Sequence, residues 1–321
     1  MKENRQDIPI FFTIDDEYAP YLGVAMLSLM ENASKDYNYK IHVVYKGLSK
    51  TNKERLASLK QDCFGVELVE MDDTLKEITD RKENRLRCDY FTLAIFFRLL
   101  LADMFPQYDK GLYIDSDVVI PGDISRLYQT ELKDGRLIGA CVDHSVENIP
   151  EIVKYFEQAT GIPQAQYVNS GILLMNFQYM REKEFGRKFL EMLNTWHFYS
   201  LCPDQDYLNA MCHGKILYLD EEWDVMPNKG RPKHKNPQII HYNLFDKPWC
   251  YDGIQYEEYF WKYAAKSIYY QELLEYKKNY GEEQKARDRM NLMALIDNAN
   301  AGPDAEITFK KMYEKGVQIR V

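Results

Sequence analysis

Two carboxylates, Asp115 and Asp117, are separated by a single residue and follow the short apolar run 112–114. The run is β-favouring and uninterrupted, as expected of a strand that is buried on both faces. Ligands of open α/β sheets bind outside the carboxyl ends of the strands, so both side chains should face a ligand. Carboxylates at this spacing can share one hard divalent cation, which could bridge the phosphates of a nucleotide.

The D-x-D spacing alone is weak evidence. Roughly two such triplets are expected by chance in a chain with this many aspartates, and the chain holds a second one, Asp204-Gln205-Asp206. That triplet heads a predicted helix, so its acids can equally be N-terminal caps. Support for a metal site at Asp115 must therefore come from the sequence elements around it.

The first part of the chain has the pattern of alternating strands and helices. Strands are predicted at 8–14, 39–45 and 66–71, with helices at 20–32 and 50–60 between them. This order implies a parallel sheet with right-handed crossovers. An acidic stretch, 15–18, falls between the first strand and its helix, where either a ligand or merely a helix first turn is expected.

Arg98 interrupts the apolar sequence AIFFRLLL in a helix predicted at 92–104. An arginine on such a face is seldom buried without a partner. Either its head group reaches the surface along its apolar stem, or it contacts a phosphate or the acids near Asp115. The charged segment 76–89 before it is expected to form a surface loop or lid.

Further strands are predicted at 137–142, 168–177, 216–219 and 239–242, with a helix at 178–196. Asp143 follows the first of these strands. His241 ends the last one, and Lys247 lies six residues beyond it. A histidine that binds metal and a lysine that binds phosphate form a coherent pair. The basic loop 228–235 is expected to be solvated.

Composition limits the possible functions. The chain has 321 residues, 45% of them apolar, and a net charge of −9, which argues against a nucleic-acid partner. Its six cysteines form no C-x-x-C pair, and its start is polar, so a cytoplasmic location is expected. No apolar run reaches the roughly 18 residues that would cross a bilayer.

The composition changes near residue 255, where tyrosines alternate with charges in helix-forming sequence. We therefore divide the chain into a catalytic domain, 1–254, and a helical, Tyr-rich extension, 255–321. Packing of the extension on the catalytic domain is favoured over peripheral contact with the inner face of a membrane, because its acids nearly balance its bases.

Taken together, these stretches resemble glycosyltransferase family 8, the retaining GT-A enzymes that include lipooligosaccharide galactosyltransferases and glycogenin. The resemblance covers about residues 8–250. It rests on FFTIDDEYAPYLGVAMLSL, FFRLLLADMF, LYIDSDVVI, VNSGILLMNF, CPDQDYLN and HYNLFDKPW. It implies an α/β, Rossmann-like GT-A fold with a mixed, mostly parallel sheet and helices on both faces, followed by the helical extension.

The resemblance implies where a UDP-sugar donor and its metal would bind. Base and ribose would lie at Thr13, Ile14, Asp15, Glu17 and Tyr18. A Mn²⁺ or Mg²⁺ ion would bind Asp115, Asp117 and His241. Ser116 matches a backbone contact to the ribose, and Leu244 and Lys247 match the loop that meets the diphosphate.

The resemblance also implies the catalytic and acceptor residues. Asn169 and Ser170 match residues around the donor sugar, with Asp204 and Gln205. The expected catalytic residues are Gln205, Asp204, Lys247 and Arg98, and Asp143 matches an acid on the acceptor side. Retention by analogy with glycosidases would require a carboxylate nucleophile. An amide such as Gln205 fits a front-face, ion-pair-like path better.

Two positions depart from the family pattern. Leu244 stands where the family often has the glycine that lets backbone approach the diphosphate, and Glu17 stands where asparagine is common. The expected reaction remains transfer of a hexose, glucose or galactose, from UDP to a saccharide, glycolipid or protein acceptor. Such a reaction belongs to the synthesis of cell-surface polysaccharide, lipopolysaccharide or glycoconjugates.

Two alternatives remain. A phosphatase of the haloacid dehalogenase type also places D-x-D after an apolar strand, with the first acid as nucleophile. The phosphatase interpretation gives no role to the sequence blocks 15–18, 204–206 and 241–247. The other alternative is a catalytically silent nucleotide-sugar-binding protein. The sequence gives no support for lost catalysis, because each expected metal-ligand position carries a residue that can bind a metal.

Overall fold

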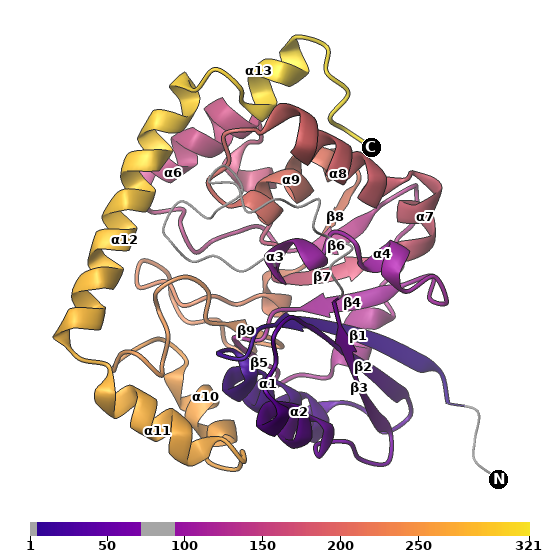
Figure 1. Cartoon of the computed structure of the whole chain (residues 1–321), viewed down its shortest axis with the longest axis vertical. Coiled ribbons are helices and arrows are strands. Elements are labelled where there is room, and N and C mark those ends of the chain that lie inside the picture. Colours follow the sequence, from indigo (N-terminus) through magenta and orange to yellow (C-terminus); the bar gives the residue numbers. More distant parts are fainter. Residues whose placement is uncertain (1–4, 72–93) are drawn as a thin grey trace.

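The computed structural model describes residues 5–71 and 94–321, so the predicted loop or lid at 76–89 lies outside the described residues. Its centre is a seven-stranded sheet (Figure 1). In spatial order the strands are β3 (Phe64–Glu70), β2 (Asn38–Tyr45), β1 (Asp7–Ile14), β4 (Gly111–Ile114), β7 (Ile172–Met175), β6 (Ile138–Ala140) and β8 (Ile216–Tyr218). Only β7 runs antiparallel to its neighbours, so the sheet is mixed and mostly parallel, as predicted.

Helices cover both faces of this sheet because successive strand residues point to opposite sides. In β1, Ile10 and Phe12 face one core and Phe11 faces the other. The first core packs against α1 (Ala19–Asn32) and α10 (Glu257–Ala264). The second packs against α4 (Leu101–Met104), α7 (Phe177–Glu182), α8 (Phe185–Trp196) and α9 (Pro203–Cys212).

A small second sheet supports the site. It pairs β5 (Val118–Val119) with β9 (Ile240–His241) in antiparallel register, Val118 opposite His241. The strand predicted at 239–242 therefore exists, but it does not join the main sheet. Short helices α2 (Lys50–Ala57), α5 (Ile124–Tyr128) and α6 (Pro150–Tyr155) connect the strands.

Two of the predicted helices are wrong as continuous elements. The helix at 92–104 is instead α3 (Ala94–Phe97) and α4, joined by a turn at Arg98 in which Leu99 N–H bonds to Phe96 O. The helix at 178–196 breaks before α8, where Glu184 adopts a left-handed conformation with φ of 54°. Apolar periodicity continues through both breaks, so it could not reveal them.

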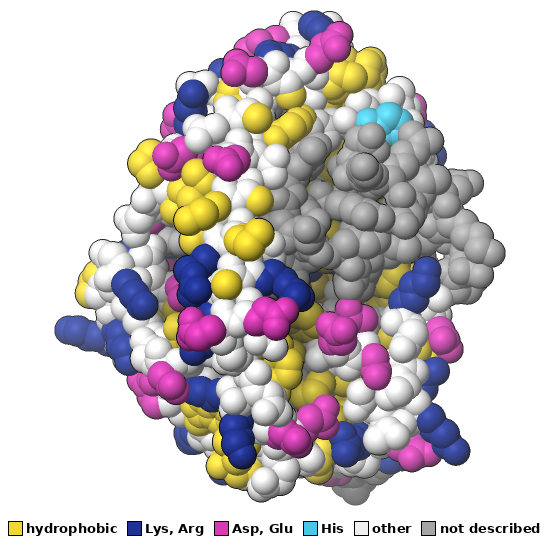
Figure 2. Space-filling model, turned by 60° about the vertical axis from the view of Figure 1, so that its left-hand side comes forward, with side chains coloured by type: hydrophobic (Ala, Val, Ile, Leu, Met, Phe, Trp, Pro, Cys, Tyr) yellow, Lys and Arg dark blue, Asp and Glu magenta, His cyan; other side chains and the backbone are white. Residues whose placement is uncertain are grey.

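The extension packs on the rest of the molecule. Helix α11 (Tyr270–Asn279) follows α10 beside α1 and α2, α12 (Glu282–Ala301) runs along the edge of the molecule to α6, and α13 (Phe309–Glu314) adds Phe309 to the second core (Figure 1). Acidic and basic side chains are intermixed over the face that includes α12 (Figure 2). None of the described helices combines the length and the apolar character that a membrane span requires.

Candidate active site

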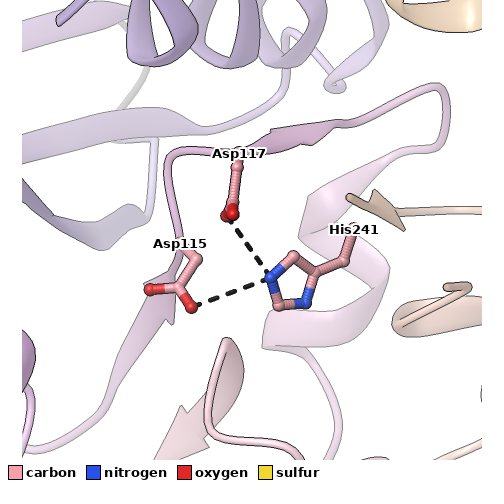
Figure 3. Close-up of side chains that lie close together, drawn as sticks. All are labelled: Asp115, Asp117 and His241. Carbon is pink, nitrogen blue, oxygen red and sulfur yellow. Dashed lines mark ion pairs between the residues drawn. The ribbon is translucent and has the colours of Figure 1, made fainter. Parts of the chain in front are cut away.

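The ends of three elements bring the predicted metal ligands together (Figure 3). Asp115 follows β4 directly, Asp117 precedes β5, and β9 carries His241 to the same point. The Nε2 atom of His241 lies 3.3 Å from Asp117 Oδ1 and 3.8 Å from Asp115 Oδ2. One ligand atom from each residue lies within 4.8 Å of the others. Two carboxylates and one imidazole are a suitable donor set for Mn²⁺ or Mg²⁺.

The surroundings of His241 fit a metal ligand. Its Nδ1 atom pairs with Asp224 Oδ1 at 3.1 Å, which aims Nε2 at the two carboxylates. Burial opposes the charge of His241, but Asp117 and Asp224 outweigh it and raise its pKa to about 10. Burial raises the pKa of Asp224 to about 6. A Cβ atom on Gly171 would collide with the His241 ring and with Asp115, so this glycine keeps the centre open.

Arg98 lies in the site and not at the surface, so the surface interpretation was wrong. It is buried, and its Nη2 lies 2.9 Å from Asp115 Oδ1 while its Nε lies 3.2 Å from Asp204 Oδ2. Its Nη1 donates to the Ser170 carbonyl at 2.8 Å. Burial works against the charge, but the neighbouring carboxylates Asp115 and Asp204 more than offset it and raise the pKa of Arg98. The turn between α3 and α4 directs this side chain inward.

Residues expected around the donor sugar form one buried network. Ser170 donates its hydroxyl to Asp204 at 2.9 Å and its N–H to Gln205 Oε1 at 3.0 Å. The Gln205 amide donates to Asp143 Oδ2 at 2.9 Å, and Asn169 donates to the same oxygen at 3.2 Å. Asp143, expected on the acceptor side, is therefore placed against Gln205.

Lys247 closes the network from the loop after β9. Its ammonium group contacts Asp117 Oδ2 and the carbonyl of Tyr242. Burial opposes ionisation of Asp117, yet Lys247 and His241 lower the pKa of that carboxyl. Leu244 in the same loop has φ of 49°, in the left-handed region that favours glycine. The backbone thus keeps the conformation that suits the family's glycine although the residue is leucine.

The residues expected to hold the nucleoside surround the end of β1. Asp15 Oδ1 accepts from the N–H of Tyr18 at 3.2 Å, and burial raises the pKa of Asp15. Thr13 hydrogen-bonds to the hydroxyl of Tyr113 at 2.9 Å, while Ile14 and Ser116 are buried. Glu17 and Tyr18 line a cavity of about 730 Å³ that reaches Lys247.

A second cavity of about 160 Å³ adjoins the first. It holds the metal ligands, the predicted sugar residues and an apolar wall: Val146, Ile152, Phe156, Leu201 and Leu295. Asp117 and Leu244 line both cavities. The candidate metal centre therefore lies where a nucleotide-sized cavity meets a smaller one.

Sequence reasoning missed three residues of the site: Tyr113, Gly171 and Asp224. Tyr113 donates to Asp115 Oδ1 at 2.5 Å from inside β4, where it looked like a core residue. From the sequence, Gly171 was noted only as one of the residues that begin a predicted strand. Asp224 follows two other acids in the sequence EEWDV, and nothing in one sequence distinguishes it from those acids.

Comparisons with known proteins show the family of the chain. The family model described as glycosyl transferase family 8 matches residues 9–253. The chain belongs to glycosyltransferase family 8. All of the predicted site residues fall inside the matched region, whereas helices α10 to α13 fall outside it.

Relatives and a solved structure extend the comparison. A putative glycosyltransferase of Haemophilus influenzae is 26% identical over 76% of this chain and 72% of its own length. A lipopolysaccharide 1,2-glucosyltransferase of Escherichia coli is 25% identical over 84% and 83%. The galactosyltransferase LgtC, solved with donor and acceptor sugar analogs, superposes with a TM-score of 0.69 at 23% identity, over 87% of this chain and all of that one. The fold is thus GT-A.

Proposed function

We propose that this glycosyltransferase moves a hexose from a UDP-sugar to an acceptor hydroxyl with retention of configuration, with the aid of a divalent metal. The observation that carries the proposal is the junction of the two cavities. There Asp115, Asp117 and His241 face one point, Lys247 stands on the side of the larger cavity, and Arg98 stands on the other. A diphosphate placed at this junction would join a nucleoside in the larger cavity to a sugar in the smaller one.

The charges at the junction suit a leaving diphosphate. A bound Mn²⁺ or Mg²⁺ ion, held by Asp115, Asp117 and His241, would supply Lewis-acid stabilisation of that anion. Lys247 contacts Asp117, so its ammonium group stands beside the metal position and would stabilise the charge of the phosphates. Arg98 holds Asp115 and Asp204 in position through its two ion pairs.

Retention without a protein nucleophile is supported by how Gln205 is held. Its amide nitrogen donates to Asp143 and its carbonyl oxygen accepts from the Ser170 N–H. A neutral amide engaged at both ends is a poor covalent nucleophile. The front-face path, in which the departing UDP accepts the proton of the attacking hydroxyl, requires from Gln205 only that it shape the sugar site.

The acceptor belongs on the side of the smaller cavity, which Asp143 lines together with apolar side chains. Among the relatives is a lipopolysaccharide glucosyltransferase, and a galactosyltransferase shares the fold, so we propose a saccharide or glycolipid acceptor of the cell surface. We also propose a cytoplasmic location, because all five described cysteines are free and four of them are buried. Peripheral membrane contact through the extension stays a prediction.

A screen of UDP-sugars with Mn²⁺ tests the proposal, scored by UDP release and by hydrolysis of the donor. We expect UDP release from UDP-glucose or UDP-galactose that disappears when the metal is chelated. A phosphatase would instead form a covalent phosphoenzyme at Asp115, and detection of that adduct would overturn the transferase assignment. A silent binding protein would bind UDP-sugars and Mn²⁺ but release no UDP with any acceptor.

A further inference from the structure

The larger cavity has a wall that the family match does not cover. Its lining includes Glu17, Tyr18 and Tyr21 near the start of α1, together with Lys247. The lining also includes Glu272, Leu273 and Tyr276 of α11, followed by Tyr280 and Asp288. Residues 255–321 lie beyond the region 9–253 that matches the family. The extension therefore contributes directly to the cavity in which we place the nucleotide.

Helix α11 is held firmly in this position. Glu272 pairs with Arg55 of α2 at 3.0 Å, and Lys277 pairs with Asp252 at 2.8 Å. The buried ring of Tyr269 lies so close to Gly23 of α1 that a Cβ atom there would collide with it. The wall is thus a built part of the molecule, fastened to the catalytic domain at both ends of the helix.

Tyr276 stands out on this wall because its large ring is 46% exposed. It lies 6.5 Å from the Tyr21 ring, edge to face, and 5.7 Å from the Tyr280 ring. Tyr21 in turn stacks on Trp249 at 4.2 Å. Aromatic rings from three separate segments thus gather at one end of the cavity and leave the Tyr276 ring accessible.

The two ends of the cavity suit different parts of a nucleotide. Lys247 and Asp117 stand at the end that meets the candidate metal centre, where a diphosphate would lie. The base and ribose must then extend toward the aromatic end, because the smaller cavity, about 160 Å³, holds the predicted sugar residues. Bases stack on aromatic faces, and carboxylates such as Glu17 accept hydrogen bonds from ribose hydroxyls.

We propose that Tyr276 of the C-terminal extension is a nucleoside-binding residue that closes the donor cavity over the base and ribose. This inference rests on the proposed function, since it takes the ligand to be a nucleoside diphosphate. It assigns the extension a part in donor recognition. The nucleoside would lie in the cavity that the start of α1 and helix α11 line together, in contact with Tyr18 and Tyr276.

Calorimetric titration of the full chain tests this, with UDP and Mn²⁺ as the probe. Tyr276→Ala should weaken UDP binding about 5- to 150-fold, the range expected for loss of one stacked aromatic ring. Tyr276→Phe should stay within about two-fold of the wild type, because the ring face is retained. The matched control is Tyr313→Ala: this ring on α13 is also 45% exposed but does not line this cavity, and its loss should change nothing.

Inorganic pyrophosphate with Mn²⁺ is the second probe, since it lacks the nucleoside. Its affinity should be equal in the wild type and in Tyr276→Ala. Equal UDP affinity in the two proteins, or an equal loss for pyrophosphate and UDP, overturns the role of Tyr276 but leaves the transferase intact. Failure of the wild type to bind UDP, ADP, GDP or CDP overturns the proposed function and this inference together.

Discussion

The two D-x-D triplets of this chain share a spacing but not a geometry. Asp115 and Asp117 lie in a turn between two strands, and their carboxylates converge on His241. Asp204 and Asp206 lie in the first turn of α9, where residues two apart are separated by about 200° around the helix axis. Asp204 accordingly reaches Arg98, while Asp206 points into the interior.

Asp206 shows what the second triplet does. Its two carboxylate oxygens accept from the hydroxyls of Tyr155, Tyr167 and Ser200 and from the N–H groups of Leu201 and Cys202. Burial raises the pKa of Asp206 although these donors oppose the shift. The first triplet thus gathers cations around a ligand site. In the second, Asp204 pairs with Arg98 at that same site, whereas Asp206 organises the protein interior. The backbone on which a triplet sits decides between these roles.

Breaking the first triplet should have the largest effect. Asp117→Asn replaces an anion that faces His241 and Lys247 by a neutral amide, a poor ligand for a hard cation. We expect transfer to fall at least about 1,000-fold, since several kcal/mol of charge stabilisation would be lost. Initial rates of UDP release with Mn²⁺ measure this.

Asp204→Asn is the control for that variant. Asp204 pairs with Arg98 but does not belong to the metal cluster, so Mn²⁺ binding should persist while turnover falls. Loss of Mn²⁺ binding in Asp204→Asn, or normal turnover in Asp117→Asn, would contradict the division between the two triplets.

Removing Asp206, the interior member of the second triplet, should lower stability instead of activity. Asp206→Ala removes an acceptor that five donors share, most of them buried, and we expect the free energy of unfolding to drop by about 3 kcal/mol or more. Chemical denaturation measures this, with Mn²⁺ affinity determined on the folded protein. If the affinity fell while stability stayed unchanged, Asp206 would belong to the active site.

A smaller effect should follow when the support of the metal centre is weakened. Asp224→Ala removes the carboxylate that holds His241 Nδ1, and Mn²⁺ affinity should fall about 10- to 100-fold. Asp224→Asn keeps an oxygen acceptor and should lose less. Turnover at saturating Mn²⁺ should be largely retained in both variants, which separates a positioning residue from one that contacts the substrate.

Sequence and resemblance predicted much of this site because its residues end strands or flank them. Asp115, Asp117 and His241 all stood beside short apolar runs, and the parallel order of the first strands placed the carboxyl ends together. The predicted mixed, mostly parallel sheet and the cover of helices on both of its faces were therefore correct. Arg98 was correctly singled out, because a charge within an apolar run requires a partner.

What the sequence could not show are contacts between buried neighbours. Asp224 and Tyr113 act through single hydrogen bonds that only the folded chain creates. The break at Arg98 was hidden because a tight turn and a helix have nearly the same apolar spacing over four residues. The left-handed backbone of Leu244 was not predictable from leucine, which rarely adopts it.

The smallest expected effect comes from a matched pair of buried tyrosines. Tyr113 donates to Asp115 Oδ1 and Tyr167 donates to Asp206 Oδ1, each at 2.5 Å, and neither ring is exposed. Phenylalanine at either position deletes one hydroxyl and keeps the ring. Tyr167→Phe should lower the free energy of unfolding by about 1–2 kcal/mol, because four donors to Asp206 remain. Denaturant titration measures this loss, and Mn²⁺ affinity should not change.

Tyr113→Phe should give the opposite pattern. The Tyr113 hydroxyl holds Asp115 Oδ1, and so leaves Oδ2 directed at His241 and the metal position. Without it Asp115 keeps its ion pair with Arg98 but loses part of its orientation, so Mn²⁺ affinity should weaken a few-fold.

Tyr113→Phe also removes the hydrogen-bond partner of Thr13, whose hydroxyl lies at the end of β1 where we place the nucleoside. UDP affinity without metal separates the two consequences: a loss there reports on Thr13, and a loss seen only with Mn²⁺ reports on Asp115. Equal stability losses in the two variants, with metal binding unchanged in both, would show that a tyrosine partner does not distinguish the two triplets.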